Sequence, residues 1–275
     1  MADIRQSSQY ARFMVDLGWK TEKVGKWNAY IKKIPLIGYF IKIQKIRSPI
    51  PFEEIEKLRK KYKLLKLQIS PDILSTNRNV YKQFIDHNFK IDFSPNIPTQ
   101  TIQINLSQSE KKLFNNLTSA KRRAVRRAIK NGVMVRQSND IGSFITIRKR
   151  QNFPMGFLLV TEMEKLWKNF YPDKASLLLA YKDKQTISGI LLLFNDQVAY
   201  YWYASSMHQG KQLFAPTILA WEAIKLAKKK GYKIFDFEGI YDERFSQSTQ
   251  SWRGFTKFKE GFGGKKISYI GSFVK

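Results

Sequence analysis

The chain of 275 residues carries 49 basic and 22 acidic side chains, a formal net charge of +27, and it contains no cysteine. Disulfides, thiolate nucleophiles and cysteine zinc sites are therefore excluded, and with only two histidines, His87 and His208, a Ser-His-Asp arrangement is not expected. The hydrophobic fraction of 43% indicates a folded globule, and the positive charge indicates polyanionic partners such as RNA, phosphorylated substrates or an anionic membrane surface.

Helix and strand patterns alternate through the first hundred residues. Apolar residues three and four apart predict helices over residues 7–17 and 52–62, and alternating apolar residues predict strands over 19–43 and 63–70. No stretch approaches the roughly 20 consecutive apolar residues of a membrane span, and the N-terminus lacks the apolar core of a signal peptide. We therefore expect a cytoplasmic protein, with peripheral contact at the inner face of the membrane left open.

A strongly basic helix is predicted after a strand at residues 101–106. Ser107 and Glu110 form a capping box and Asn131-Gly132 is a typical stop, so we expect one helix of about 23 residues, roughly 34 Å long. Between Ser107 and Gly132 there are eight basic residues and one acidic residue. The repulsion between these like charges is unrelieved unless an anionic partner binds, which favours a surface that faces phosphate groups. An ordinary solvated helix face is the alternative. The candidate residues for binding tRNA or phosphate are Arg122, Arg123, Arg126, Arg127 and Lys130.

The following segments are predicted as helices at residues 145–153, 161–170 and 214–230 and as strands at 175–181, 186–194 and 198–205.

The strand at 198–205 carries four consecutive aromatic residues. Alternation along it directs Tyr201 and Tyr203 to one face and Tyr200 and Trp202 to the other. Core packing is the simpler interpretation. Tyrosine hydroxyls beside an apolar pocket also suit binding of a ribose, an adenine or a peptide, so Tyr201 and Tyr203 are candidate binding residues.

The last forty-odd residues combine charge, aromatic rings and glycine. A strand after Gly231 alternates Asp236 and Glu238 with apolar residues. The segment that follows, 255–264, places Lys259 and several glycines among phenylalanines. Glycine lets the backbone approach a ligand closely, and lysine supplies a positive charge, so this combination indicates a site. A strand, a surface loop and a turn with a solvated lysine is the alternative.

These motifs together resemble the Fem family, whose members transfer amino acids from aminoacyl-tRNA onto peptidoglycan precursors. The resemblance rests on the F-D-F-x-G-I strand from Phe235, the F-K-x-G-F-G-G segment from Phe258, a short last strand at 268–271 and the R-R-x-V-R-x-A pattern from Arg122. It implies a mixed α/β (α+β) fold with two GNAT-like subdomains packed together. The first covers residues 1–106, the second covers 107–264 and carries the catalytic motif, and a last strand at about 265–275 packs back on the first.

The chemistry of the transfer, in which an amine attacks an aminoacyl ester, leads to hypotheses for the roles of individual residues. Lys259 is expected to neutralise an oxyanion or the departing ribose oxygen, Phe258 to pack on the terminal adenosine, and Asp236 or Glu238 to orient or deprotonate the attacking amine. Substrate-binding roles are expected for Phe258, Tyr201, Tyr203, Arg150, Gly261 and Gly263. No metal or cofactor is expected. The chain departs from the family where nucleotide-diphosphate-binding members place an arginine and a tyrosine, because it has Met155, Gly156 and Phe157.

We therefore expect a monomeric aminoacyltransferase with two partners, an aminoacyl-tRNA and a peptidoglycan precursor, either UDP-MurNAc-pentapeptide or lipid II. A GNAT-type N-acyltransferase with an acyl-CoA donor, acting on a cell-envelope sugar or lipid amine, stays open. The segment 209–215 lacks the small residues that a coenzyme A phosphate loop requires, which weakens that alternative. A non-catalytic RNA-binding protein is the third hypothesis.

Overall fold

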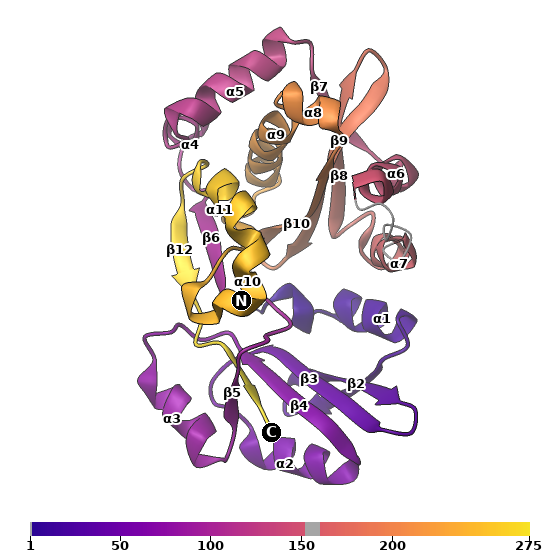
Figure 1. The fold of residues 1–275 in the computed structure, drawn as a ribbon, viewed down its shortest axis with the longest axis vertical. Coiled ribbons are helices and arrows are strands. Elements are labelled where there is room, and N and C mark those ends of the chain that lie inside the picture. The colour runs from indigo at the N-terminus through magenta and orange to yellow at the C-terminus, as the bar shows by residue number, and fades with distance from the viewer. Residues whose placement is uncertain (1, 152–159) are drawn as a thin grey trace. The chain divides into compact units, whose positions relative to one another are not determined.

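The computed structural model describes residues 2–151 and 160–275, whose contacts group into two compact units (Figure 1). Unit 1 contains the described residues of Met1–Thr101 with Gly239–Arg253 and Lys266–Lys275, and unit 2 contains those of Ile102–Glu238 with Gly254–Lys265. The contacts therefore assign residues 239–253, which the sequence analysis included in the second subdomain, to unit 1. No helix in the described ranges is both long and apolar enough to cross a membrane.

Unit 1 is built on a six-stranded sheet. In spatial order its strands are β1 (Lys20–Val24), β2 (Trp27–Ile34), β3 (Gly38–Ile46), β4 (Leu64–Pro71), β13 (Ser272–Val274) and β5 (Lys90–Asp92). The first three form an antiparallel meander, and β4 pairs parallel to β3. The C-terminal strand β13 is antiparallel to both of its neighbours, β4 and β5. The end of the chain thus completes the sheet that its beginning starts.

The helical elements of unit 1 are η1 (Ile4–Gln6), α1 (Ser8–Asp16), α2 (Phe52–Lys61), α3 (Arg78–Asp86), η3 (Glu243–Phe245), α10 (Ser246–Thr249) and η4 (Gln250–Trp252). Helices α2 and α3 contribute Ile55 and Phe84 to the buried core, which also contains Ile43 and Phe273. The rings of Phe84 and Phe273 stack with centroids 4.2 Å apart, so α3 helps to hold the last strand in the sheet.

Unit 2 contains most of a seven-stranded sheet. Its spatial order is β12 (Lys265–Ser268), β6 (Gln100–Asn105), β11 (Ile234–Gly239), β10 (Val198–Ser206), β9 (Gln185–Asn195), β8 (Ala175–Lys182) and β7 (Met134–Ser138). Strands β8 to β10 form an antiparallel meander and β7 pairs antiparallel with β8, whereas β10 and β11 run parallel. Both sheets are therefore mixed, which confirms the predicted mixed α/β class.

The helices of unit 2 are α4 (Glu110–Asn115), α5 (Ser119–Lys130), α6 (Ile141–Gln151), α7 (Val160–Phe170), α8 (His208–Gln212), α9 (Ala215–Lys229) and α11 (Arg253–Glu260). In Figure 1, α9 lies on one side of β8 to β10, and α6 and α7 lie on the other. Gly189 of β9 makes room for α6, because a Cβ there would lie 2.6 Å from the ring of Phe144. The central strands, buried on both faces, accordingly read as continuous apolar runs.

The prediction of one long basic helix from Ser107 is wrong, because the segment forms two helices, α4 and α5. Ser109 caps α4 by accepting a hydrogen bond from the Lys112 amide (3.3 Å), and Thr118 caps α5 by accepting one from the Lys121 amide (3.4 Å). The amide of Thr118 itself donates to the carbonyl of Gly261 at 2.9 Å. A second capping residue and a tertiary hydrogen bond thus interrupt a sequence whose local propensity favours one helix.

Candidate active site

Lys259 lies on α11, a helix that the sequence analysis did not predict because its glycines suggested a turn. Helical spacing directs Phe255 and Lys259, four residues apart, to one side and Phe258 and Phe262 to another. Gly263 and Gly264 then connect α11 to β12. Their φ angles of 78° and 95° are positive, and glycine adopts such a backbone conformation without steric cost. The glycine-rich motif therefore ends a helix that carries the lysine.

The Lys259 side chain is enclosed by aromatic rings, and the residue is 8% exposed. Its Nζ lies 4.7 Å from the ring centroid of Phe255 and 5.9 Å from that of Tyr201. Burial lowers the pKa of the Lys259 ammonium to about 8, although the negative charges of Glu238 and Asp236 act in the opposite direction. The Lys259 ammonium therefore loses its proton at a lower pH than the ammonium of an ordinary lysine does.

The two carboxylates on β11 have different surroundings. Asp236 is buried, and its two oxygens accept hydrogen bonds from the Gln103 side chain (2.8 Å) and from the Glu238 backbone amide (2.7 Å). Glu238 is partly buried and has a left-handed backbone with φ 58°. The Asp236 carboxylate thus holds the left-handed backbone at Glu238, and both carboxylates lower the energy of the Lys259 ammonium.

Tyr201 and Tyr203 do not follow the simple alternation that was predicted for β10. The pairing of β10 with β9 shifts register between these two residues, so a rule of period two does not hold across them. Tyr201 is buried beside Phe237, with ring centroids 5.3 Å apart, and burial raises the pKa of its phenol. Tyr203 instead donates a hydrogen bond to Glu162 at 2.8 Å. The two tyrosines thus belong to separate surroundings within unit 2.

The arginine predicted for substrate binding, Arg150, lies exposed at the end of α6. Two residues earlier, Arg148 lies over the Tyr203 ring, 4.2 Å from its centroid, and donates to Ser205 at 3.4 Å. Burial lowers the pKa of the Arg148 guanidinium. Arg148 follows the buried Phe144 by four residues, and this helical spacing was the available signal for it. The departure at Met155, Gly156 and Phe157 lies outside the described residues.

The predicted site glycines contact the protein itself. A Cβ at Gly261 would lie 2.6 Å from Cε of Lys121, and a Cβ at Gly263 would lie 2.9 Å from the carbonyl oxygen of Asn116. The small size of these glycines therefore lets the end of α11 pack against the junction between α4 and α5. The close approach that the sequence analysis assigned to a ligand is made here by Lys121 and Asn116.

The basic residues of α5 divide into two groups. Arg122 donates hydrogen bonds to the carbonyls of Asn115 and Leu117 and so completes the end of α4. The remaining candidates are exposed, namely Arg123, Arg126, Arg127 and Lys130. Two of these also contact rings, because the guanidinium carbons of Arg126 and Arg127 lie 5.8 and 5.9 Å from the centroids of Phe114 and Phe214. The exposed surface of α5 is thus positively charged.

Comparisons with known proteins agree with the family resemblance. Residues 172–275 match the FemAB family model. The crystal structure of FemX superimposes with a TM-score of 0.80 at 18% identity, over 99% of this chain and 92% of that one. The C-terminal domain of a putative lysylphosphatidylglycerol synthetase from Agrobacterium fabrum gives 0.64 at 12% identity, over 98% and 88% of the two chains. None of the curated protein sequences matches the chain.

A tandem GNAT protein from the clavulanic acid biosynthesis pathway also shares the fold, with a TM-score of 0.56 at 8% identity, over 100% of this chain and 96% of that one. This likeness agrees with the predicted pair of GNAT-like subdomains. The family model includes β10, β11 and α11, and with them Lys259, Asp236, Glu238 and both tyrosines. The basic helix α5 lies before the matched residues.

Proposed function

Residues 172–275 belong to the FemAB family, and from that premise we propose that the chain is an aminoacyltransferase of peptidoglycan assembly. It takes an amino acid from aminoacyl-tRNA and joins it to the side-chain amine of the stem peptide, on UDP-MurNAc-pentapeptide or lipid II. The observation that carries the proposal is the buried Lys259, which lies within the family match between aromatic rings and two carboxylates.

The reaction converts an ester into an amide. The nitrogen of the acceptor amine attacks the carbonyl carbon of the aminoacyl ester, a C–N bond forms, and the C–O bond to the ribose breaks. The amine loses a proton and the ribose oxygen gains one. Because an amide is more stable than an ester, the enzyme has mainly to align the two groups and to stabilise the oxyanion that develops on the carbonyl oxygen.

Lys259 is the group that we assign to the oxyanion or to the departing ribose oxygen. Its ammonium lies in an aromatic environment, where a charge interaction is stronger than in water. With a pKa of about 8, most of it is charged at neutral pH. An oxyanion nearby would raise that pKa, so the stabilisation is largest when the negative charge has formed, as differential transition-state binding requires.

Glu238 is the better candidate for orienting or deprotonating the amine. Both oxygens of Asp236 already accept hydrogen bonds from Gln103 and from the backbone, and a donor from the substrate would have to compete with them. Glu238 is only partly buried, and its backbone conformation is fixed by Asp236. We therefore assign Asp236 to positioning and Glu238 to contact with the acceptor.

The remaining candidates complete the proposal. Phe258 packs on the terminal adenosine, and Tyr201 and Tyr203 contribute to substrate binding. Arg150, exposed at the end of α6, contributes to substrate binding, whereas Gly261 and Gly263 let the end of α11 pack against α4 and α5. The exposed basic residues of α5 contact the tRNA, with Arg122 serving the helix junction. A cytoplasmic monomer with peripheral contact to anionic lipid suits these partners.

Single-turnover transfer tests the proposal. Radiolabelled aminoacyl-tRNA is mixed with the protein and either UDP-MurNAc-pentapeptide or lipid II, and acetyl-CoA is offered as donor in parallel. Protein-dependent movement of label onto the stem peptide is the expected result. Transfer from acetyl-CoA alone would instead support the GNAT-type alternative. Because the fold is shared with the C-terminal domain of a putative lysylphosphatidylglycerol synthetase, vesicles of phosphatidylglycerol serve as a third acceptor.

A further inference from the structure

A second lysine, Lys121, lies against α11 at its C-terminal end. Its ammonium is 3.8 Å from the ring centroid of Phe258 and 5.3 Å from that of Phe262. Its aliphatic carbons pass over Gly261, where a Cβ would come within 2.6 Å of Cε. The side chain is thus held in a fixed place between the first turn of α5 and the helix that carries Lys259.

Among the described residues, no acidic group pairs with the charge of Lys121. Burial alone lowers the pKa of its ammonium to about 8. Within residues 2–151 and 160–275, the structure records aromatic contacts at its Nζ and no hydrogen bond or ion pair. A partly buried cation without a carboxylate costs folding free energy, because the rings replace only part of the lost hydration.

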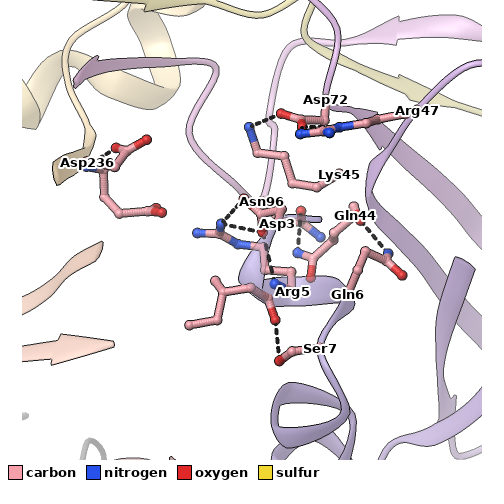
Figure 2. A network of polar contacts seen from close by, with 12 residues as sticks. Asp3, Arg5, Gln6, Ser7, Gln44, Lys45, Arg47, Asp72, Asn96 and Asp236 are labelled. Atoms are coloured by element: carbon pink, nitrogen blue, oxygen red, sulfur yellow. Dashed lines mark hydrogen bonds and ion pairs between the residues drawn. The ribbon is translucent and has the colours of Figure 1, made fainter. Parts of the chain in front are cut away.

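Other buried lysines of this chain do have carboxylates. In unit 1, Lys45 lies over the Tyr269 ring at 3.2 Å, and its Nζ is also 3.5 Å from Asp72 (Figure 2). In unit 2, Lys259 lies near Asp236 and Glu238. Lys121 has the aromatic part of this arrangement, and in the part of the chain that the structure describes it has no anionic part. An anion supplied from outside the chain would complete it.

The position of Lys121 relative to Lys259 indicates which part of a substrate would supply this anion. Phe258 and Phe262 are 5.2 Å apart, Phe262 lies 5.4 Å from Phe237, and Phe237 lies 5.3 Å from Tyr201. Lys121 lies over one end of this series of rings, and Lys259 lies beside Tyr201 at the other. A donor whose acyl group reaches Lys259 would therefore have the part next to its acyl group near Phe258 and Lys121.

We propose that Lys121 binds a phosphate group of the acyl donor while the Phe258 ring offers a face for the adjoining base. Lysine is a common phosphate ligand because its ammonium is a compact point charge, and base stacking on an aromatic ring does not depend on sequence. This inference rests on the proposed function. The phosphate belongs either to the 3′ end of a tRNA or to coenzyme A, and both are tested.

The experiment compares the wild-type protein with Lys121→Met, which removes the charge and keeps a side chain that fits over Gly261. Lys168→Met, at an exposed position of α7, is the matched control. Dissociation constants are measured at several salt concentrations for two probes, an RNA minihelix that ends in CCA and coenzyme A. We expect Lys121→Met to weaken binding of the minihelix about tenfold and to reduce the salt slope by about one, with the control unchanged.

Two readouts separate phosphate binding from a structural role. The midpoint of thermal unfolding of Lys121→Met should equal or exceed that of the wild type, because an unmatched charge is removed. In the wild type, NMR titration of the Lys121 ammonium should show its pKa rising when the minihelix binds. This second measurement needs no variant and decides the question if Lys121→Met folds poorly.

Equal binding by wild type and Lys121→Met, or no shift of the ammonium pKa, would overturn the inference. The proposed function would stand in that case if single-turnover transfer from aminoacyl-tRNA is seen. Binding of coenzyme A alone, lost in Lys121→Met, would uphold the phosphate site and move the donor to acyl-CoA. Failure of the wild type to bind either probe would also overturn the inference.

Discussion

Oδ1 of Asp236 accepts a hydrogen bond from the backbone amide of Glu238 at 2.7 Å. The bond holds Glu238 in the left-handed region, where a residue with a Cβ is disfavoured by roughly 1–2 kcal/mol. Backbone strain of this kind is often found at functional sites. The sequence F-D-F-E-G therefore encodes more than a strand, because its aspartate fixes the conformation of the glutamate that follows.

Substitutions of Glu238 distinguish the effect of its strained backbone on stability from the effect of its carboxylate on transfer. Glu238→Gly should raise the free energy of unfolding by about 1 kcal/mol, since glycine accepts φ 58° without strain, and should abolish the contribution of the carboxylate to transfer. Urea denaturation and single-turnover transfer measure the two effects. Glu238→Gln is the control for shape and should lower transfer with little change in stability. Full activity in Glu238→Gly would remove this carboxylate from the mechanism.

Asp236→Asn tests the positioning role. An amide keeps the size of the carboxylate but replaces one acceptor oxygen by a donor, so the hydrogen bonds to Gln103 and Glu238 can both be kept only if the Gln103 amide turns over to accept, and the negative charge is lost in either case. We expect a loss of about 1–3 kcal/mol in the free energy of unfolding. Transfer should fall only to the extent that the left-handed backbone at Glu238 is disturbed. Normal stability with complete loss of transfer would show instead that Asp236 acts on the substrate.

Lys259→Met should reduce the single-turnover rate about a hundredfold or more, because it removes the charge assigned to the oxyanion. Lys257→Met, two residues away and exposed on the same helix, is the matched control and should transfer normally. A rate for Lys259→Met close to that of the wild type would exclude the ammonium from the reaction.

Much of the fold could be predicted because local signals and tertiary packing agree. The apolar helix at 215–229 and the strands of the meander at 175–206 follow their periodicity closely. The break between α4 and α5 could not be predicted in the same way. It depends on Gly261, which is remote in sequence and accepts the amide hydrogen of Thr118. Local propensity favours a continuous helix there, and a tertiary contact overrides it.

The candidate site likewise contains residues that could be identified from the sequence and residues that could not. Lys259, Asp236 and Glu238 were identified by residue type and by the family motif, and the structure brings the lysine near both carboxylates. Lys121 and Arg148 were missed as individual residues, since each is one basic side chain among many and only burial distinguishes it. The simple alternation predicted for Tyr201 and Tyr203 failed because a register shift is not visible in a run of aromatic residues.

The stability of the protein should depend on pH through Lys259. Its pKa is about 8 in the folded protein against an ordinary value of 10.5, so between these pH values the unfolded chain binds more protons than the folded one. The free energy of unfolding therefore rises with pH in this interval, and below it the buried charge costs about 3 kcal/mol. Urea denaturation at about pH 7 and about pH 10 should show a smaller rise for Lys259→Met than for the wild type. Equal rises would mean that Lys259 keeps its ordinary pKa.

Transfer should have the opposite pH dependence from stability. The rate needs the charged ammonium, so it should fall as pH rises through about 8, and Lys259→Met should lack this limb. Single-turnover rates at saturating donor measure the limb in the bound state. Because the donor is anionic, its binding should raise the pKa of the ammonium. The pH midpoint of the fall in rate should therefore be higher at saturating donor than at low donor concentration. A limb that persists in Lys259→Met would assign the titration to another group.

Gly261 and Lys121 should be energetically coupled. Gly261→Ala introduces a Cβ 2.6 Å from Cε of Lys121, so the lysine must move, and we expect a loss of about 1–3 kcal/mol in the free energy of unfolding. Lys121→Ala removes the obstructing carbons, and the double variant should therefore recover part of the loss. A double-mutant cycle by urea denaturation gives the coupling free energy, which should exceed about 0.5 kcal/mol for residues in contact. Additive effects would show that the end of α11 does not pack on Lys121, and would remove the fixed placement of its ammonium over Phe258.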